Sequence, residues 1–235
     1  MAYDFEITKG ELFCLAAMYG YDSLLNIPYE PEEFEGDLAA LFHQISGRLR
    51  AKGWLEEDFD GNVTVSAGLE LAVSLCAAPF LLWQLQLHSK KGAAQDTVIN
   101  AYNSGESYLI LRQTDGEGYA GMLLEGYAEF VEAVKEYMPL PDVSNTYSEL
   151  TEDQLSSILE AEPFTLVNIS KCSLETDGPE KAILCHDAAM LLLLERGGAY
   201  MLYAGDSGNG TFLPVSQAEF DARMEILFAG EEGQQ

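Results

Sequence analysis

The last two thirds of this chain contain two similar segments. Five apolar or turn-forming residues around a Pro-Phe pair recur at one constant offset, the spacing from Pro79 to Pro163. The first set is Leu71, Leu75, Pro79, Phe80 and Leu82, and the second set is Leu155, Leu159, Pro163, Phe164 and Leu166. Self-similarity at a fixed distance predicts a fold built from two related halves.

A second match lies further along the chain. The segment SYLILRQTDGEGYAGMLLEGYAEFVEAV resembles AYMLYAGDSGNGTFLPVSQAEFDARMEI, with Tyr108 matching Tyr200 and Phe130 matching Phe220. The offset is slightly larger here, so the second copy contains a small insertion. Neither copy has an obvious catalytic motif. A duplicated unit of this kind favours a pseudo-symmetric binding scaffold over a single active-site cleft.

Within each copy, the residue pattern predicts a helix, a meander of strands and a closing helix. In FLLWQLQLH, apolar Leu81, Trp83, Leu85 and Leu87 alternate with mostly polar residues, which is typical of an antiparallel strand with one wet face. Closing helices are expected from about Gly126 and from about Ser216. Two such units placed edge to edge give an α+β fold with a pseudo-twofold central antiparallel sheet.

The first part of the chain predicts a different module. Thr8 and Glu11 form the pattern of a capping box before an amphipathic helix. A second helix near residues 37–52, a hairpin around Asp60-Gly61 and a third helix near residues 66–77 follow. The second helix is expected to bury five residues. They are Leu38, Leu41, Phe42, Ile45 and Leu49.

These patterns define the expected organisation. Residues 1–65 form an N-terminal helical head with a hairpin, residues 66–140 form the first α+β repeat, and residues 148–229 form the second. Residues 230–235 form a disordered tail. The parts are expected to pack as one compact domain.

Charge limits the classes of partner. The 39 acidic residues against 12 basic ones give a net charge of −27. Such a surface repels phosphates, so nucleic acid and anionic membranes are unfavourable partners and a basic or amphipathic protein fits better. Simple solubility, or a salt-adapted host, is an alternative reason for the charge. The longest apolar runs, Ala77–Trp83 and Ala188–Leu194, are too short to span a bilayer, and the first residues do not resemble a signal peptide, so we expect a cytoplasmic protein.

The residues that could carry chemistry do not form a convincing site. Cys185, His186 and Asp187 are consecutive, but neighbouring side chains of a strand point to opposite faces, so the thiol and the imidazole cannot easily meet. The three histidines lack metal-ligand spacing, and DFDGN departs from the order of a calcium-binding loop. The four cysteines are expected to be buried free thiols. We therefore expect no enzyme, no metal and no cofactor.

Three segments, read in order, carry a family resemblance. ELFCLAAMYGYDSLLNIP, LRAKGWLEEDFDGNVTVSAGLELAVSLCAAP and GGAYMLYAGDSGNGTFLPVSQAEFDARMEIL resemble the EspG-type chaperones of bacterial type VII secretion systems. The resemblance covers nearly the whole chain and consists of patterns of apolar residues and glycines. It implies an internally duplicated α+β protein whose central antiparallel sheet is flanked by helical bundles. It also implies a non-enzymatic cytosolic chaperone or adaptor that shields the helical tip of a secreted substrate, either a PPE-type protein or another helical hairpin, and keeps it soluble.

An alternative comes from the N-terminal segment. Helix, helix, hairpin and helix in this order resemble a winged-helix module, which suggests a transcriptional regulator that binds DNA. The second helix offers only Arg48, Arg50 and Lys52, all at its C-terminal end, where recognition residues are least useful. The chaperone is therefore the first hypothesis.

The partner-binding residues are predicted from expected exposure alone. The polar face of the first strand and the aromatics near turns are the candidates. They are Gln84, Gln86, His88, Tyr102 and Tyr119.

Overall fold

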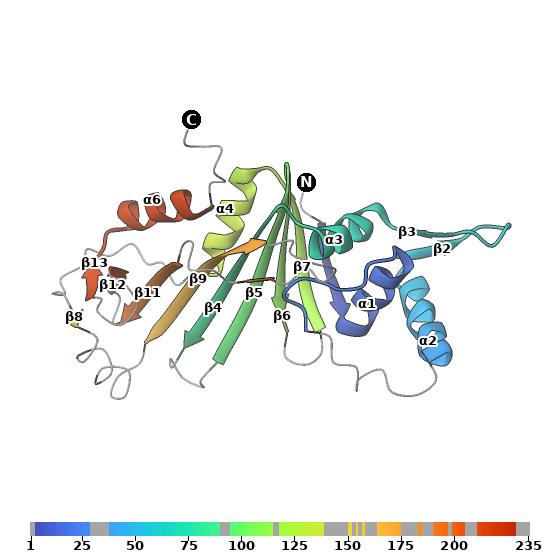
Figure 1. The fold of residues 1–235 in the computed structure, drawn as a ribbon, viewed down its shortest axis with the longest axis horizontal. Coiled ribbons are helices and arrows are strands. Elements are labelled where there is room, and N and C mark those ends of the chain that lie inside the picture. The colour runs from blue at the N-terminus through green and yellow to red at the C-terminus, as the bar shows by residue number, and fades with distance from the viewer. Residues whose placement is uncertain are drawn as a thin grey trace. The chain divides into compact units, whose positions relative to one another are not determined.

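The protein is an α+β chain with a large antiparallel sheet and, in its described part, five helices (Figure 1). The computed structural model describes residues 3–28, 38–89, 95–114, 118–138, 150–151, 154, 157, 164–174, 183–184, 190–196, 199–204 and 211–228. The predicted α+β class is confirmed. The predicted tail at residues 230–235 lies outside the described residues.

The chain divides into two compact units. The first unit contains Met1–Phe80 and Ala101–Gly126, and the second contains Leu81–Asn100 and Tyr127–Gln235. This division follows contacts within the fold, so the boundaries predicted from the sequence repeat stay predictions.

The first unit combines three helices, a small hairpin and a meander. Its strands are joined in the order β1-β7-β6-β5, while β2 and β3 form a separate two-stranded sheet. The elements are β1 (Tyr3–Thr8), α1 (Lys9–Met18), α2 (Leu38–Ala51), β2 (Leu55–Glu57), β3 (Val63–Val65), α3 (Ala67–Ala77), the end of β5 (Gln95–Ser104), β6 (Ser107–Gln113) and β7 (Gly118–Glu125).

Helix α1 begins with the predicted capping box. The N–H of Glu11 donates to Oγ1 of Thr8 at 3.2 Å, and the N–H of Thr8 donates to Oε2 of Glu11 at 2.9 Å. Two backbone donors at the start of the helix are thereby satisfied. The prediction of a capping box is confirmed.

Helix α2 buries a narrower stripe than the sequence predicts. Ile45 and Leu49, four residues apart, are buried, and Leu41 on the same stripe is half-buried. Phe42 is 43% exposed, so its predicted burial is wrong. Phe42 lies seven positions before Leu49 and within about 20° of it around the helix, so helical periodicity does not account for the exposure of Phe42. The side chain of Leu38 lies outside the described part of the structure.

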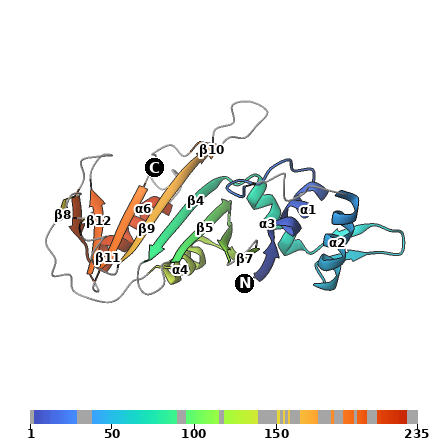
Figure 2. The same ribbon diagram turned by 90° about the horizontal axis from the view of Figure 1, so that it is seen from below.

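The second unit is a sheet with two helices. Its strands are joined in the order β5-β4-β9-β11-β12-β13-β8, with β10 also paired to β9 (Figure 2). The elements are β4 (Leu81–Ser89), the start of β5, α4 (Tyr127–Glu136), β8 (Leu150–Thr151), β9 (Thr165–Leu174), β10 (Ile183–Leu184), β11 (Met190–Arg196), β12 (Ala199–Ala204), β13 (Thr211–Pro214) and α6 (Gln217–Phe228).

An aromatic cluster joins α4 and α6 to strand β4. The ring of Trp83 lies 5.4 Å from the rings of Phe130 and Phe228, and those two rings lie 5.3 Å apart. The indole N–H of Trp83 donates to the carbonyl of Leu227 at 3.2 Å, so its one polar group is satisfied in the core. Both helices therefore pack on the sheet face that Trp83 occupies.

The two meanders have a similar element order. The first runs β4, β5, β6, β7 and then α4, with β1 paired to β7. The second runs β9, the two-residue strand β10, β11, β12, β13 and then α6, with β8 paired to β13, so it differs from the first by β10. The matched tyrosines lie in β6 and β12, and the matched phenylalanines lie in α4 and α6. Strands β1 and β8 also correspond in pairing, although the sequence repeat is recognisable only from about residue 66.

Candidate partner-binding surfaces

A row of polar side chains lies along β4 and β9 in the second unit. It consists of Gln84, Gln86 and His88 on β4 with Asn168 and Ser170 on β9, and is called the polar strip below. The antiparallel register places Gln84 opposite Ser170 and Gln86 opposite Asn168, so these residues share one face of the sheet. Gln86 is exposed and the other four side chains are half-buried.

Hydrogen bonds link the members of the polar strip to each other. The Gln86 amide donates to Oε1 of Gln84 at 2.8 Å, and the Gln84 amide donates to Oδ1 of buried Asn100 on β5 at 3.4 Å. On β9, the Ser170 hydroxyl donates to Oδ1 of Asn168 at 3.5 Å. The amide groups are therefore held in place before any partner arrives.

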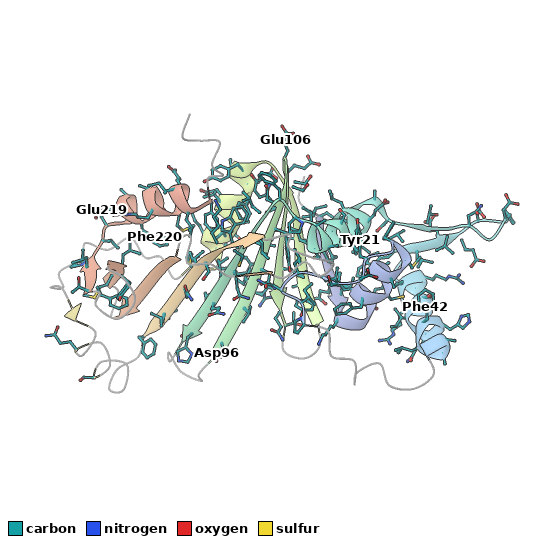
Figure 3. All side chains as sticks on the ribbon, viewed as in Figure 1. Tyr21, Phe42, Asp96, Glu106, Glu219 and Phe220 are labelled. Carbon is teal, nitrogen blue, oxygen red and sulfur yellow. The ribbon has the colours of Figure 1, made fainter. Side chains whose placement is uncertain are left out.

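His88 lies at one end of the polar strip. Its Nδ1 contacts a carboxylate oxygen of Asp96, which lies on β5 and is labelled in Figure 3. Its ring packs 5.7 Å from the ring of Phe164. Residues that alternate with the strip, including Trp83, Leu85 and Ile169, are fully buried. The strip thus lies on the sheet face opposite to α4 and α6, as the alternation in FLLWQLQLH predicts.

The predicted exposure of Tyr102 and Tyr119 is wrong. Tyr102 is fully buried, and its hydroxyl donates to the carbonyl of Leu25 at 2.7 Å. Tyr119 on β7 is 6% exposed. The sequence places both residues near turns, but both lie within strands and their side chains are buried. Neither tyrosine belongs to a surface that a partner meets first.

The basic end of α2 is neutralised within the first unit. Arg50 pairs with Glu57 on β2. Nζ of Lys52 lies 2.7 Å from Oε2 of Glu11 and 3.2 Å from the carbonyl oxygen of Glu6, and it sits 4.3 Å above the ring of Trp54. Two of the three cations near the end of α2, Arg50 and Lys52, are therefore already paired with carboxylates and are less available to phosphates.

Burial favours the neutral form of two thiols, those of Cys14 and Cys76. Burial raises the pKa of the Cys14 thiol to about 11, and burial also raises the pKa of the Cys76 thiol. Since the thiolate is the nucleophile, neither cysteine is suited to covalent catalysis at neutral pH.

Cys185, His186 and Asp187 lie outside the described residues. Where the structure describes the chain, no group of three or more His, Cys, Asp or Glu side chains could hold a metal ion, and no helix is long and apolar enough to cross a membrane.

The hairpin of β2 and β3 carries a residue that the sequence analysis did not single out. Residues 55–65 are called the acidic hairpin below, because their charged residues are Glu56, Glu57, Asp58 and Asp60. At its turn, Phe59 is fully exposed. The signal in the sequence is an aromatic residue between two aspartates of a turn, DFDGN, where no apolar neighbour is available to cover it.

Comparison with known proteins supports the architecture. No protein-family model matches the chain, and no curated protein sequence matches it. Among solved structures, the fold is similar to that of the Mycobacterium tuberculosis type VII secretion system chaperone EspG5, solved in complex with a PE25-PPE41 dimer. The TM-score is 0.60 at 11% sequence identity, over 97% of this chain and 98% of that chain. The resemblance predicted from the sequence is thus confirmed at the level of the fold, which this chain shares with EspG5 along nearly its whole length.

Proposed function

We propose that this protein is a non-enzymatic cytoplasmic chaperone or adaptor. Its client is a secreted helical protein of a type VII-like secretion system, which it keeps soluble before export. The observation that carries this proposal is the fold similarity to the EspG5 chaperone over 97% of the chain. This support is an analogy between folds, extended over nearly the whole length of both chains.

The net charge of −27 supports a protein client. A strongly acidic surface stays soluble and attracts basic partners, whereas it repels phosphate backbones. DNA binding is not proposed, because Arg50 and Lys52 are paired with carboxylates of the same unit.

We further infer that the two meanders derive from a duplicated unit. The constant offset around Pro79 and Pro163 and the similar order of elements support this inference.

Within this proposal, the polar strip is the surface expected to contact the client. Gln84, Gln86 and His88 are accessible or half-buried and can donate and accept hydrogen bonds. The hydrogen bond from Gln86 to Gln84 and the contact of His88 with Asp96 reduce the entropy that these side chains lose on binding.

The test is co-expression with the secreted helical proteins encoded beside this protein. We expect one of them to gain solubility and to elute with this protein as a complex in size-exclusion chromatography with light scattering. A matched control is co-expression with an unrelated acidic protein of similar size. If no neighbouring helical protein binds or gains solubility over that control, the proposed function is wrong.

A further inference from the structure

Phe59 is the most exposed large apolar side chain in the described part of the chain. It is fully exposed, whereas the next most exposed are Ile226 at 68% and Phe80 at 66%. Figures 1 and 2 show that the acidic hairpin extends away from α2 and α3, with the turn at its far end. The Phe59 ring therefore stands in solvent without packing in the free protein.

The turn that carries Phe59 is held in one conformation. Oδ1 of Asp58 accepts the N–H groups of Asp60 and Asn62, both at 2.9 Å, and Oδ2 accepts the Asn62 amide at 2.8 Å. These hydrogen bonds lower the pKa of the Asp58 carboxyl, and the bond from the Asn62 side-chain amide has the largest effect. Gly61 has a φ of 81°, which a residue with a side chain rarely adopts. Because the backbone of the turn is already ordered, it loses little conformational entropy when Phe59 binds a partner.

The base of the acidic hairpin is tied to α2. The Trp54 N–H donates to the Leu49 carbonyl at 2.9 Å, and the Ser66 N–H donates to the Trp54 carbonyl at 2.9 Å. The Arg50–Glu57 ion pair adds a contact between the helix and β2. The acidic hairpin is thus held by hydrogen bonds at its base and at its turn, and the turn carries an exposed aromatic residue.

The negative charge near Phe59 favours a partner with a basic surface. No Lys or Arg occurs between Lys52 and Lys90, while Glu56, Asp58 and Asp60 lie within three residues of Phe59 in the chain and are exposed. Nucleic acid and anionic lipid are disfavoured by these carboxylates, and a second copy of this chain would bring like charges together. The complementary surface is an apolar socket with Lys or Arg at its rim.

We propose that Phe59 is an anchor that inserts into an apolar socket, rimmed by basic residues, on the helical client. This inference rests on the proposed function, because the client is the partner. Buried aromatic anchors commonly dominate the affinity of an interface, and surrounding charges mainly set the rate of association.

The experiment measures binding of the co-purified client to immobilised protein by surface plasmon resonance. We expect Phe59→Ala to weaken affinity by about tenfold or more, mainly through faster dissociation, and Phe59→Trp to stay within about threefold of the wild type. The matched control is Phe42→Ala, an exposed phenylalanine on α2 (Figure 3), which should bind like the wild type. The double variant Glu56→Gln, Asp60→Asn should slow association and flatten its salt dependence.

The outcomes separate this inference from the proposed function. Thermal unfolding of Phe59→Ala should match the wild type, because the ring packs against nothing. If the wild type binds the client and Phe59→Ala binds equally well, the anchor is wrong and the chaperone proposal stands. Equal weakening by Phe42→Ala also overturns the anchor, since any exposed aromatic then suffices. If the wild type binds no client, the proposed function fails and the anchor fails with it.

Discussion

Lys52 and Glu11 form an ion pair that joins the end of α2 to the start of α1. The Nζ to Oε2 distance is 2.7 Å, and the carboxylate is 1% exposed while the Lys52 side chain is 35% exposed. The other carboxylate oxygen, Oε1, is buried and has no hydrogen-bond partner within the described structure. The ion pair with Lys52 and the hydrogen bonds of the capping box therefore offset the free-energy cost of burying the Glu11 carboxylate.

We expect Lys52→Met to destabilise the protein by about 1 to 3 kcal/mol, because it leaves the Glu11 carboxylate buried without its cation. Chemical denaturation measures the free energy of unfolding. The control is Lys135→Met, whose partners Glu132 and Asp221 are 75% and 30% exposed and keep contact with water, and its cost should stay below about 1 kcal/mol. Equal costs for the two variants would show that burial of Glu11 contributes nothing.

The same carboxylate predicts a pH dependence. Burial by itself raises the pKa of Glu11, but hydrogen bonds from Lys52 and Thr8 and the charge of Lys52 outweigh burial and hold the pKa below its usual value. A pKa lowered by folding stabilises the protein above the unfolded pKa, and this stability is lost as the pH falls through the folded pKa.

Glu11→Gln tests this dependence. The difference in free energy of unfolding between wild type and Glu11→Gln should be largest above about pH 5 and should shrink as the pH is lowered toward about 3. Urea denaturation at a series of pH values gives the two curves. A difference that stays constant over this range contradicts the assignment of the lowered pKa to Glu11.

Any side chain at Gly121 is expected to destabilise the protein. It lies opposite Phe5 in the β1–β7 pairing, and a Cβ there would overlap the Phe5 ring. Gly121→Ala should cost about 1 to 3 kcal/mol in thermal or chemical unfolding. Gly47→Ala is the control, since a Cβ on this exposed glycine of α2 meets nothing within 4 Å, and alanine should stabilise the helix by up to about 1 kcal/mol. In a Phe5→Leu background the cost of Gly121→Ala should fall.

The sequence predicts well where the determining contacts are local. The capping box depends on Thr8 and Glu11, three residues apart, and the two faces of β4 follow from alternation within nine residues. The buried hydroxyl of Tyr102 bonds to Leu25, 77 positions away, and Phe42 is exposed although it lies close to buried Leu49 around α2. Such contacts are set by tertiary packing, which periodicity alone does not specify.

Binding to polyanions distinguishes the chaperone from a DNA-binding regulator. The protein should pass through a heparin column at about 50 mM salt without retention, because the net charge repels sulfate and the α2 cations are paired. Retention that weakens steeply as salt rises would instead support nucleic-acid binding and would count against the present proposal.

The polar strip is tested at its most exposed residue. Gln86 lies in the middle of β4, and replacing it with Trp places a bulky side chain over Gln84 and Asn168. If the client seats on this strip, Gln86→Trp should weaken binding by about tenfold or more in the surface plasmon resonance assay, since the new ring holds the two surfaces apart. Gln113→Trp, at an exposed glutamine that ends β6, is the matched control and should bind like the wild type. Unchanged affinity for Gln86→Trp would remove the strip from the interface, whereas equal losses in both variants would point to a general effect of added apolar surface.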